Sequence, residues 1–598
     1  MKKGVQQSLS PAFLSSGLQD ITYTVVNSQN KKEKLDLLKG VGGYLQAGEM
    51  AALMGPSGSG KSTLLDVLSG RKTVGELQGE VAFAGNRPTP QFLRRFTGYV
   101  EQFDTLLDIL TVEEMLMWVL ALQGCRNVRI GNPMARGISG GQAKRVNIGI
   151  ALVTNPRVLF LDEPTSGLDS YTANEVMSVV KSLASHGITV CATIHSPTPY
   201  TFNLFDRLLL LLKGRVVYFG PNGKQALDYF HRQCPCLEGV KDGENEAEWL
   251  VDLTTEADRQ NRVADFAAAY ERSEFKAAAD KEIAAQLATA SELADRPDFC
   301  RAEEETQRDL AVRRDTVTPF WWGLRTLLKY RTLKNYRNPE YLGPRIGDKL
   351  IFSLLIFTLF WKVGNNLAQD NLMNIAAVLY MWVTLPAFGA SSFVPAIVLE
   401  RPLFTRERND GLYRVITYLV AKIVDELCVA LVCSIVFANI VWWALQLQGS
   451  FALFWLIYFL TLSTGIGEGA VLAERQFTVL AYTVAALSPN MDVANAALPA
   501  YVVTLLFFSG FLIRFEKIPN YWKWYAYIDV LRYAWGALMK NQFDGDRNVE
   551  FVSGQTILDY YSLSGISAWG WLGIEAAFVA VFFVFAYLAL KFVSHVRR

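Results

Sequence analysis

The sequence predicts an α/β domain with a phosphate-binding loop, followed by an all-α domain of about six membrane-crossing helices. Three observations lead to this fold class. At 598 residues the chain is too long for one hydrophobic core. Residues up to about 315 have the charge content of a soluble domain, whereas apolar runs dominate after about 345. A glycine-rich loop lies early in the first part, between a predicted strand and a predicted helix.

The overall composition supports a chain that is only partly soluble. Hydrophobic residues make up 51% and aromatic residues 12% of the sequence, and the mean hydropathy is +0.17. The net charge of +1 indicates a mixed surface and gives no sign of a nucleic-acid partner. The first twenty residues lack an apolar core of signal-peptide length, so we expect the first domain to stay on the side of the membrane where it is made.

The seven cysteines are scattered along the chain. None lies in the polar segment 514–568, so no disulfide is predicted there. Cys234 and Cys236 are close in sequence but lack a second pair at zinc spacing, so we do not expect a metal site there.

The glycine-rich loop follows a short apolar stretch at 50–54 and precedes a helix start. Its glycines allow backbone N–H groups to close around phosphates, and the helix N-terminus adds partial positive charge. Lys61 is placed to reach the β- and γ-phosphates, and Ser62 is placed to ligate Mg²⁺. The predicted nucleotide-binding residues of the loop are Gly55, Ser57, Gly58, Gly60, Lys61, Ser62 and Thr63.

An apolar run at 158–161 ends in Asp162 and Glu163. Such a run fits a buried parallel strand that carries carboxylates to the ligand-binding edge of a sheet. Asp162 would hold Mg²⁺, and Glu163 would polarise the attacking water as a general base. An acidic strand end is more often a plain helix cap, but the upstream phosphate loop favours the catalytic interpretation.

Three further elements surround these motifs in order. Ser139, Gly140, Gly141 and Gln142 precede a predicted helix and form another anion-binding helix start. Gln102 follows the apolar run FTGYV and could sense Mg²⁺ or water, and His195 ends the run TVCATIH and could contact the γ-phosphate. A lone Gln or His at a strand end is usually structural, so the functional interpretation rests on their order and spacing.

The combination of GPSGSGKST, Gln102, ISGGQ, LFLDEPTSGLDS and His195 resembles the nucleotide-binding domain of an ABC transporter. The order of domains, with the nucleotide-binding domain first, resembles the G subfamily of white and pleiotropic drug resistance type. The segments GRKTVGELQGEV and ERPLFTRERNDGLYRV are similar to that subfamily as well. The resemblance extends from about residue 18 to the end of the sequence.

This resemblance implies ATP and Mg²⁺ bound in a head-to-tail sandwich of two nucleotide-binding domains. Ser139 and Gly141 of a second subunit would complete the site, and Asp169 would link the two sites. One domain of each kind implies a half-transporter, working as a homodimer or a heterodimer. The aromatic residue that stacks on adenine would be Tyr23, unless the family register places Val25 there.

Two departures from the family pattern bear on activity. Only residues 103–138 separate Gln102 from Ser139, which predicts a shortened helical subdomain and a doubtful contact with the membrane part. In the second half, residues 468–475 insert Glu468, Glu474 and Arg475 into an otherwise apolar region. We favour an interfacial loop or a broken helix there over a charge-lined pathway.

The predicted domains are a nucleotide-binding domain at 1–239, a linker at 240–345 and a membrane domain at 346–598. The linker is charged and rich in alanine, so we expect solvated helices, ending in an interfacial helix that contains Trp321 and Trp322. Candidate spans lie at 348–365, within 371–399, within 493–513 and at 571–591. The uncharged run 427–467 breaks at 446–450 and gives a third span and at least part of a fourth. The basic C-terminal residues favour a cytosolic end.

The charged segment 400–414 resembles the family's coupling element, and Glu407 and Arg408 are its candidate contacts. Glu575, in the last span, is expected near the outer interface, with a proton-coupling role as the minority interpretation. The resemblance implies export of a lipid, sterol or xenobiotic across what we expect to be the plasma membrane, with membrane lipid as a partner. The remaining alternatives are an ATP-gated channel and an inactive regulatory subunit; a soluble ATPase of this class is excluded by the hydropathy.

Overall fold

The structure is a computed structural model. It describes residues 16–26, 33–72, 74–83, 87–102, 106, 130, 137–233, 245–293, 316, 318–332, 335–336, 339–389, 394–466, 491–578 and 581. The chain forms two compact units, each with its own hydrophobic core. The first unit comprises Met1–Val317 with Arg406–Leu412 and Arg597–Arg598, and the second comprises Thr318–Thr405 and Tyr413–Val596.

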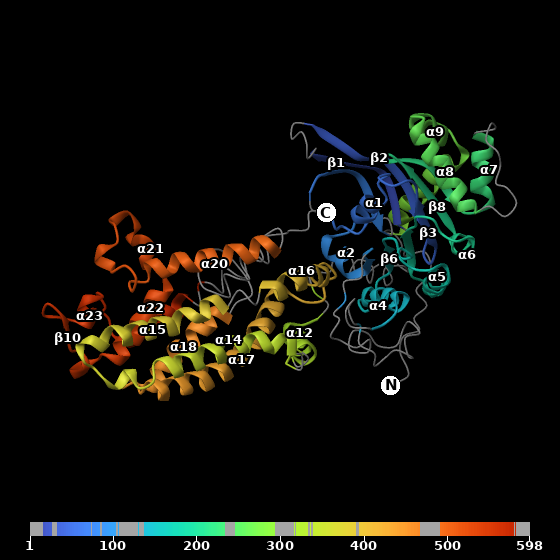
Figure 1. The fold of residues 1–598 in the computed structure, drawn as a ribbon. Helices are drawn as coiled ribbons and strands as arrows, with labels where there is room; N and C mark the ends of the chain where they lie inside the picture. Colours follow the sequence, from blue (N-terminus) through green and yellow to red (C-terminus); the bar gives the residue numbers. More distant parts are fainter. Residues whose placement is uncertain are drawn as a thin grey trace. The chain divides into compact units, whose positions relative to one another are not determined.

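Six strands form the central sheet of the first unit (Figure 1). In spatial order they are β5 (Thr97–Val100), β6 (Val158–Leu161), β7 (Thr189–Thr193), β3 (Met50–Met54), β8 (Arg207–Leu212) and β9 (Arg215–Pro221). Neighbouring strands are parallel, except that β9 runs antiparallel to β8. The four strands β5, β6, β7 and β3 are buried along their whole length, as expected for parallel strands covered on both faces.

Strand β3 shows how the two faces are covered. Because successive side chains of a strand point to opposite faces, Met50 and Ala52 join one hydrophobic cluster, whereas Ala51 and Leu53 join another. The first cluster includes side chains of α4 (Gly140–Leu152), α5 (Ser170–Ser185), α6 (Pro199–Asn203) and α7 (Lys224–Gln233). The second includes side chains of α1 (Lys61–Leu68) and α2 (Pro90–Phe96). The predicted α/β fold of this domain is confirmed.

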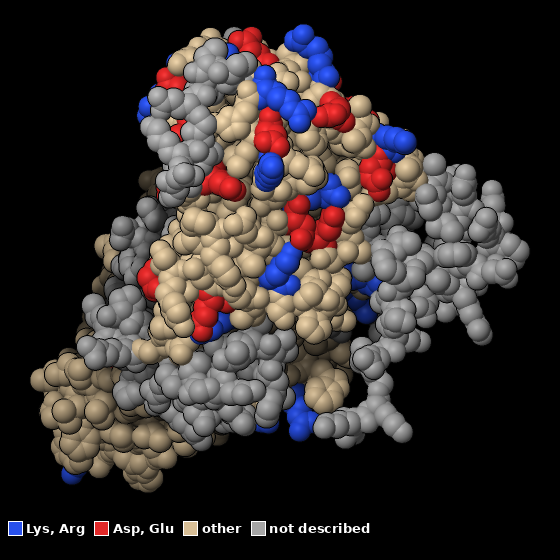
Figure 2. Space-filling model, turned by 90° about the vertical axis from the view of Figure 1, so that its right-hand side faces the viewer, with Lys and Arg blue, Asp and Glu red and all other residues tan. Residues whose placement is uncertain are grey.

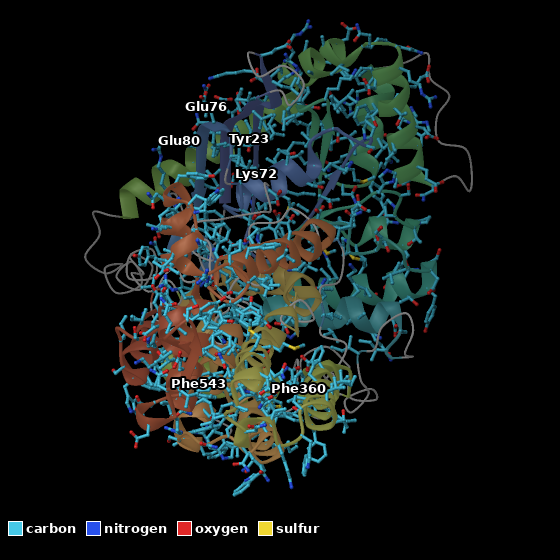
Figure 3. All side chains as sticks on the ribbon, turned by 60° about the vertical axis from the view of Figure 1, so that its left-hand side comes forward. Tyr23, Lys72, Glu76, Glu80, Phe360 and Phe543 are labelled. Atoms are coloured by element: carbon cyan, nitrogen blue, oxygen red, sulfur yellow. The ribbon has the colours of Figure 1, made fainter. Side chains whose placement is uncertain are left out.

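A second, antiparallel sheet of the same unit has the order β2 (Lys34–Leu45), β1 (Ser16–Val26) and β4 (Glu76–Phe83). Figure 3 shows Tyr23 and Lys72 close together at this sheet, with Glu76 and Glu80 on its strand β4. Lys34 pairs with Glu76 at 2.8 Å across this sheet. Figure 2 shows charged side chains of both signs mixed on the face in view.

The helices at 246–293 differ from the solvated linker that the sequence predicts. α8 (Glu246–Arg259), α9 (Val263–Glu271) and α10 (Glu274–Leu293) belong to the first unit. Leu250 and Phe266 are buried in the cluster that includes α5, and Tyr270 is buried in the cluster that includes α1. The apolar residues of these helices are outnumbered by charged and alanine residues, but they fall on one face, and that face packs on the sheet.

The second unit is helical. Its main helices are α12 (Phe320–Leu327), a π-helical turn η3 (Leu328–Thr332), α14 (Pro339–Leu359), α15 (Gln369–Gly389), α16 (Val394–Asn409), α17 (Val415–Leu445), α18 (Phe451–Ile466), α20 (Met491–Phe508), α21 (Lys523–Tyr527), α22 (Val530–Gln542) and α23 (Ile557–Tyr560), with a short hairpin of β10 (Glu550–Val552) and β11 (Gln555–Thr556). Helix α16 runs on into the segment that groups with the first unit.

Trp535 lies at the centre of the core of the second unit and is fully buried. Its ring makes edge contacts with Tyr380, Phe511 and Tyr561, and its Nε1 donates to the carbonyl oxygen of Ala376 at 3.2 Å. Phe360 and Phe543, which Figure 3 labels, pack in the same cluster. Helices distant in sequence are therefore joined by one aromatic core.

Among the described residues, one helix, α17, has the length and apolar composition needed to cross a membrane. It has 31 residues, an 18-residue stretch of it has a mean hydropathy of 2.2, and the shorter apolar helix Phe451–Leu462 follows it. The six predicted spans therefore stay a prediction, and parts of them, together with the charged insertion at 468–475, lie outside the described residues. The pair Cys234 and Cys236 also lies outside them.

Helix α17 begins twelve residues before the uncharged run in which the sequence predicts a span. This extra part carries Lys422, Asp425 and Glu426, which are buried. Lys422 Nζ lies 2.7 Å from the carboxylate of Glu400, and Asp425 accepts from Asn335 Nδ2 at 3.3 Å. Buried partners allow the helix to continue through charged residues, and a hydropathy pattern contains no information on such partners.

Replacement of Leu250 by Ala tests the packing of α8. Leu250 is fully buried, so the substitution removes apolar contacts and leaves a cavity, and we expect a loss of about 2–5 kcal/mol in the free energy of unfolding of the first unit. Glu248→Ala, at an exposed position of the same helix, is the matched control and should change this free energy by less than about 0.5 kcal/mol. Equal, small effects in denaturant titrations would mean that α8 is a solvated linker after all.

Candidate nucleotide-binding site

The order of the central sheet brings the predicted motifs to one edge. Strands β5, β6, β7 and β3 are neighbours and parallel, so their carboxyl ends lie side by side. Gln102 follows β5, Asp162 and Glu163 follow β6, and His195 follows β7. The glycine-rich loop follows β3 and leads directly into α1. Ligands of such sheets bind at this edge.

The glycine-rich loop has a conformation that requires glycine at two points. Gly55 has φ 138° and Gly60 has φ 103°, both in the region that other residues avoid. A Cβ on Gly55 would lie 2.1 Å from the carbonyl oxygen of Leu211, so the backbone of β8 leaves no room for a side chain. Gly60 is the N-cap of α1, whose first N–H groups face the loop.

Lys61 is buried beneath this loop. Its Nζ donates to the carbonyl oxygens of Gly55 at 2.7 Å and Pro56 at 3.0 Å. Burial lowers the pKa of Lys61, while the neighbouring carboxylates of Glu163 and Asp162 raise it. The ammonium group therefore already occupies the loop, and phosphate oxygens can take over its hydrogen bonds. Ser57 is exposed and Thr63 half-buried in the same loop.

Asp162 receives hydrogen bonds from three neighbouring elements. Its Oδ1 accepts from Ser62 Oγ at 3.0 Å and from Thr193 Oγ1 at 2.8 Å, and its Oδ2 accepts from Tyr99 Oη at 3.4 Å. Hydroxyl and carboxylate oxygens are the donors that Mg²⁺ prefers, so Ser62 and Asp162 fit the ion that the sequence predicts. When bound, Mg²⁺ would neutralise charge on the nucleotide phosphates.

Glu163 is held in an unusual backbone conformation. Its φ of 46° lies in the left-handed region, which costs about 1–3 kcal/mol for a residue with a side chain and often marks a functional site. The Glu163 N–H donates to Thr193 Oγ1 at 2.8 Å, which stabilises this turn. In this position Glu163 Oε2 accepts from Gln102 Nε2 at 2.7 Å. The structure thus brings together Gln102, Asp162 and Glu163, and their roles in catalysis stay a prediction.

Two residues of this network were not predicted from the sequence. The hydroxyl of Thr193 donates its one proton to Asp162 and accepts from Glu163, so it connects the two acids. Lys144 is buried, and its Nζ donates to the carbonyl oxygen of Gln102 at 2.8 Å. Thr193 lies two residues before His195 at the end of the predicted strand, which is the one sequence signal that could have identified it. Lys144 has no comparable signal.

The segment 139–142 forms the start of α4. Ser139 Oγ accepts from the Gln142 N–H at 3.3 Å, and Gln142 Oε1 accepts from the Ser139 N–H at 2.9 Å. Gly141 packs so tightly on α5 that a Cβ would lie 2.0 Å from Thr172 Cγ2. Gly140 occupies the first turn. The side-chain hydrogen bonds described for Ser139 and Gln142 are with each other, and none joins them to Lys61, Asp162 or Glu163.

The remaining predicted residues lie around this centre. His195 is exposed, with Nδ1 3.4 Å from Ser196 Oγ. Asp169 is the N-cap of α5 and accepts from the Thr172 N–H at 3.0 Å, and this hydrogen bond is the main cause that lowers the pKa of Asp169. Tyr23 is 3% exposed, and its hydroxyl donates to the carbonyl oxygen of Val74. In this structure Tyr23 is a core residue, and its stacking on adenine stays a prediction.

Most of the shortened helical subdomain predicted at 103–138 lies outside the described residues. The segment Arg406–Leu412, in contrast, groups with the first unit. Asp410 pairs with Arg71, and Arg406 Nη2 donates to the carbonyl oxygen of Asn147 in α4 at 3.1 Å. Burial raises the pKa of Asp410, while Arg71 and Arg406 lower it. Arg71 also lies 3.9 Å from Glu101, next to Gln102, so the segment contacts the elements that position the site.

From the sequence, Glu407 and Arg408 are the residues expected to make the contacts of this segment. Burial, together with the charge of nearby Arg94, lowers the pKa of Arg408, which places it close to α2. Arg406 and Asp410 are the residues with the direct hydrogen bond and ion pair described above. Arg406 and Asp410 are one helical turn apart and therefore lie on the same side of the segment. For this reason Arg406 can reach Asn147 while Asp410 reaches Arg71.

Comparisons with known proteins cover both units. A family profile described as ABC transporter matches residues 38–166, and one described as ABC-2 type transporter matches residues 323–543. The chain is 30% identical to ABC transporter G family member 38 of Oryza sativa subsp. japonica, over 98% of this chain and 40% of that protein. It is 31% identical to ABC transporter G family member 32 of the same organism, over 98% of this chain and 42% of that protein. It is 30% identical to Pleiotropic drug resistance protein 1 of Nicotiana tabacum over 100% of this chain and 42% of that protein.

The chain therefore spans about two fifths of the length of the curated relatives it matches. Among solved structures, an ADP-bound cassette of an ABC transporter is 24% identical, covering 36% of this chain and 92% of its own, with a TM-score of 0.30. A dimeric bacterial ABC transporter cassette is 28% identical, covering 34% of this chain and 98% of its own, with a TM-score of 0.29.

Replacement of Thr193 by Val tests the bridge between the two acids. The change removes one donor to Asp162 and one acceptor for Glu163 while it keeps the shape of the side chain, so we expect Mg²⁺-dependent ATP hydrolysis to fall about 10–100-fold. Thr189→Val, at the other end of β7, is the matched control and should leave the rate unchanged. Equal rates for the two variants would contradict a bridging role for Thr193.

The pH dependence of nucleotide affinity tests the state of Lys61. Burial lowers the pKa of Lys61, and phosphates favour its charged form. ATP should therefore bind more weakly as the pH rises through that lowered pKa, at a lower pH than for an exposed lysine. The dissociation constant of ATP, measured from about pH 7 to about pH 10, should rise for the native protein. Lys61→Arg keeps its charge over this range and should show a flat profile; parallel profiles would disprove the assignment.

Proposed function

The chain belongs to the G subfamily of ABC transporters, and we propose that it couples ATP hydrolysis to the movement of a hydrophobic or amphipathic molecule across a membrane. The observation that carries this proposal is the arrangement at the sheet edge. Glu163 is hydrogen bonded to Gln102, and Asp162 beside it is hydrogen bonded to Ser62 of the phosphate loop. A general base, a group that can orient water and a cation-binding pair thus converge where a γ-phosphate would lie.

Each side chain of the site has a distinct part in the proposed reaction. Lys61 compensates the negative charge on the β- and γ-phosphates, and Ser62 with Asp162 holds Mg²⁺. Gln102 orients the attacking water, and the carboxylate of Glu163 accepts its proton as the bond to phosphorus forms. His195, exposed at the end of β7, would contact the γ-phosphate. Lys144 keeps the Gln102 backbone in place.

A second nucleotide-binding domain would complete the site. Ser139, Gly140, Gly141 and Gln142 lie at the N-terminus of α4, where backbone N–H groups favour an anion. They make no described hydrogen bond to the phosphate loop of their own domain, which fits a role toward the nucleotide of a partner domain. Asp169 would connect the two sites. The partner domain is supplied by a second copy of this sequence or by a different sequence.

The second unit has the surface of a membrane domain. Large apolar side chains are exposed along α14 and α17, including Leu354, Leu359, Val432 and Trp443. An exposed apolar face of this extent is suited to lipid or to a second membrane domain. We propose a multi-pass domain of about six spans in the plasma membrane, with the nucleotide-binding domain and both ends in the cytosol, and a lipid, sterol or xenobiotic as the cargo.

Alternating access would link the two functions. ATP binding closes the paired nucleotide-binding domains, and the segment Arg406–Leu412 passes this closure to the spans. Its ion pair with Arg71, which is itself close to Glu101, offers a direct connection from the neighbourhood of Gln102. A state-dependent affinity for ATP provides the free energy that such a shift requires.

Glu163→Gln separates an active transporter from a channel or an inactive regulatory subunit. Loss of the general base should reduce ATP hydrolysis in liposomes about 10²–10⁴-fold, while ATP still binds. A native rate that equals the rate of the variant would refute active hydrolysis. Uptake of labelled lipids, sterols and drugs into inside-out vesicles, which must depend on ATP and be lost with Glu163→Gln, then identifies the cargo.

The origin of the partner domain can be tested with two inactive variants. Lys61→Met removes the phosphate contact, and Ser139→Arg blocks the N-terminus of α4. If the site forms between two copies, a mixture of the two variants contains dimers with one intact site and regains ATP hydrolysis. The same two substitutions placed on one chain and mixed with the single Lys61→Met variant leave no intact site, and this mixture is the control. No recovery in either mixture would mean that a different sequence supplies the partner domain.

A further inference from the structure

Two polar side chains meet inside the second unit at a point that the proposed function does not use. Thr461 lies on α18, and Glu575 lies on the helical residues 568–578. Thr461 is 2% exposed and Glu575 is 0% exposed. Thr461 Oγ1 lies 3.0 Å from Glu575 Oε1 and 2.8 Å from the carbonyl oxygen of Ile457. The other carboxyl oxygen, Glu575 Oε2, is buried and has no hydrogen-bond partner among the described residues.

The hydrogen bonds of Thr461 leave Glu575 with little compensation for a negative charge. Thr461 has one hydroxyl proton, and its Oγ1 donates to Glu575 Oε1 and to the carbonyl oxygen of Ile457, so the two acceptors share this proton. A buried carboxylate needs several donors, whereas the neutral acid costs far less to bury. The contacts that the structure describes for Glu575 therefore favour the neutral acid.

The surroundings of Glu575 agree with a neutral group. Its own helix has no other charged residue between 568 and 578. α18 contributes Tyr458 as its titratable side chain, and α22 contributes Arg532, Tyr533 and Lys540. Among the described residues, none of these pairs with Glu575. The Arg532 guanidinium lies over the ring of Phe515 at 3.7 Å, and Lys540 Nζ donates to the carbonyl oxygen of Ser564.

The two tyrosines are occupied by aromatic packing. Tyr533 packs on Trp571 and Phe578, which flank Glu575 on its helix, and Tyr458 stacks on Trp382. Among the described residues, an ionised carboxylate in this apolar environment would have no counter-ion, and its burial would be far more costly than that of the neutral acid.

We propose that Glu575 and Thr461 form a proton-binding site in the membrane domain, and that the site is loaded with a proton in this conformation. When a rearrangement of the helices admits water, the Glu575 O–H bond breaks, its proton passes to a water molecule, and the electron pair stays on the carboxylate. The ligand of the site is thus a proton, exchanged with water as the domain opens.

Infrared difference spectroscopy tests the occupancy of the site without any reagent. The protein reconstituted in lipid at neutral pH should show the C=O stretching band of a protonated carboxylic acid, and this band should be absent in Glu575→Gln. Glutamine keeps the size and neutrality of the acid, so the variant should retain the fold. Glu550→Gln, at an exposed position of the same unit, is the control and should leave the band unchanged. A spectrum with no band that depends on Glu575 overturns the proposal.

A hydrophobic carbodiimide gives a second measurement, because it adds to protonated carboxyl groups. At neutral pH only about 1 in 500 molecules has an exposed glutamate such as Glu550 in its protonated form. Because Glu575 is protonated in the proposed site, it should be labelled on the order of 100-fold faster than Glu550. Mass spectrometry locates the adduct. Labelling of Glu575 that appears only at acid pH, together with that of Glu550, would likewise overturn the proposal.

The link to opening rests on the proposed ATP-driven cycle and can be tested separately. In the Glu163→Gln background, bound ATP should hold the closed nucleotide-binding domains, and the infrared band of Glu575 should lose intensity or shift. A band that is present but unaffected by ATP would leave the proton site in place and refute its link to the cycle. An ATPase that fails altogether would refute the proposed function without changing the first spectrum.

Discussion

The parallel pairing of β6 with β7 and of β7 with β3 is the constraint on which the site depends. It brings the ends of these strands to one edge, where the hydroxyl of Thr193 bridges Asp162 and Glu163 and the hydroxyl of Ser62 reaches Asp162 from the phosphate loop. A shift of one residue in either pairing would reverse the face to which each side chain points and separate these groups. The strained turn at Glu163 is tolerated because this network stabilises it.

Buried polar groups recur throughout the chain and connect elements that are far apart in sequence. Lys144 joins α4 to Gln102, Arg406 joins the segment Arg406–Leu412 to α4, and Lys422 joins α17 to Glu400. Removal of one partner of such a pair leaves a buried group without compensation, which is costly. These contacts are therefore better suited to specifying one arrangement than to adding stability. In the proposed ATP-driven cycle, their positions close to Gln102 and along α17 are places where changes in structure would be transmitted.

The helices α8–α10 enlarge the first unit beyond the domain that the motifs delimit. Their burial depends on a few apolar residues, such as Leu250 and Tyr270, among many charged and alanine residues. The average composition of this segment is that of a solvated helix, and only the face that packs on the sheet shows otherwise. Although α8–α10 come shortly before the apolar part of the sequence, they pack in the core of the first unit and are not a solvated linker.

The chemistry of the nucleotide site is determined by the sequence itself, because glycines, Lys61, Asp162 and Glu163 occur at spacings that a strand–loop–helix unit converts directly into positions. The division into an α/β part and an apolar helical part follows from composition and hydropathy in the same way. The contacts of Thr193, Lys144 and Glu575, the start of α17 and the packing of α8 were decided only by the tertiary structure. Each depends on a partner many residues away in the chain, and a local pattern contains no information on which distant group will lie opposite a side chain after folding.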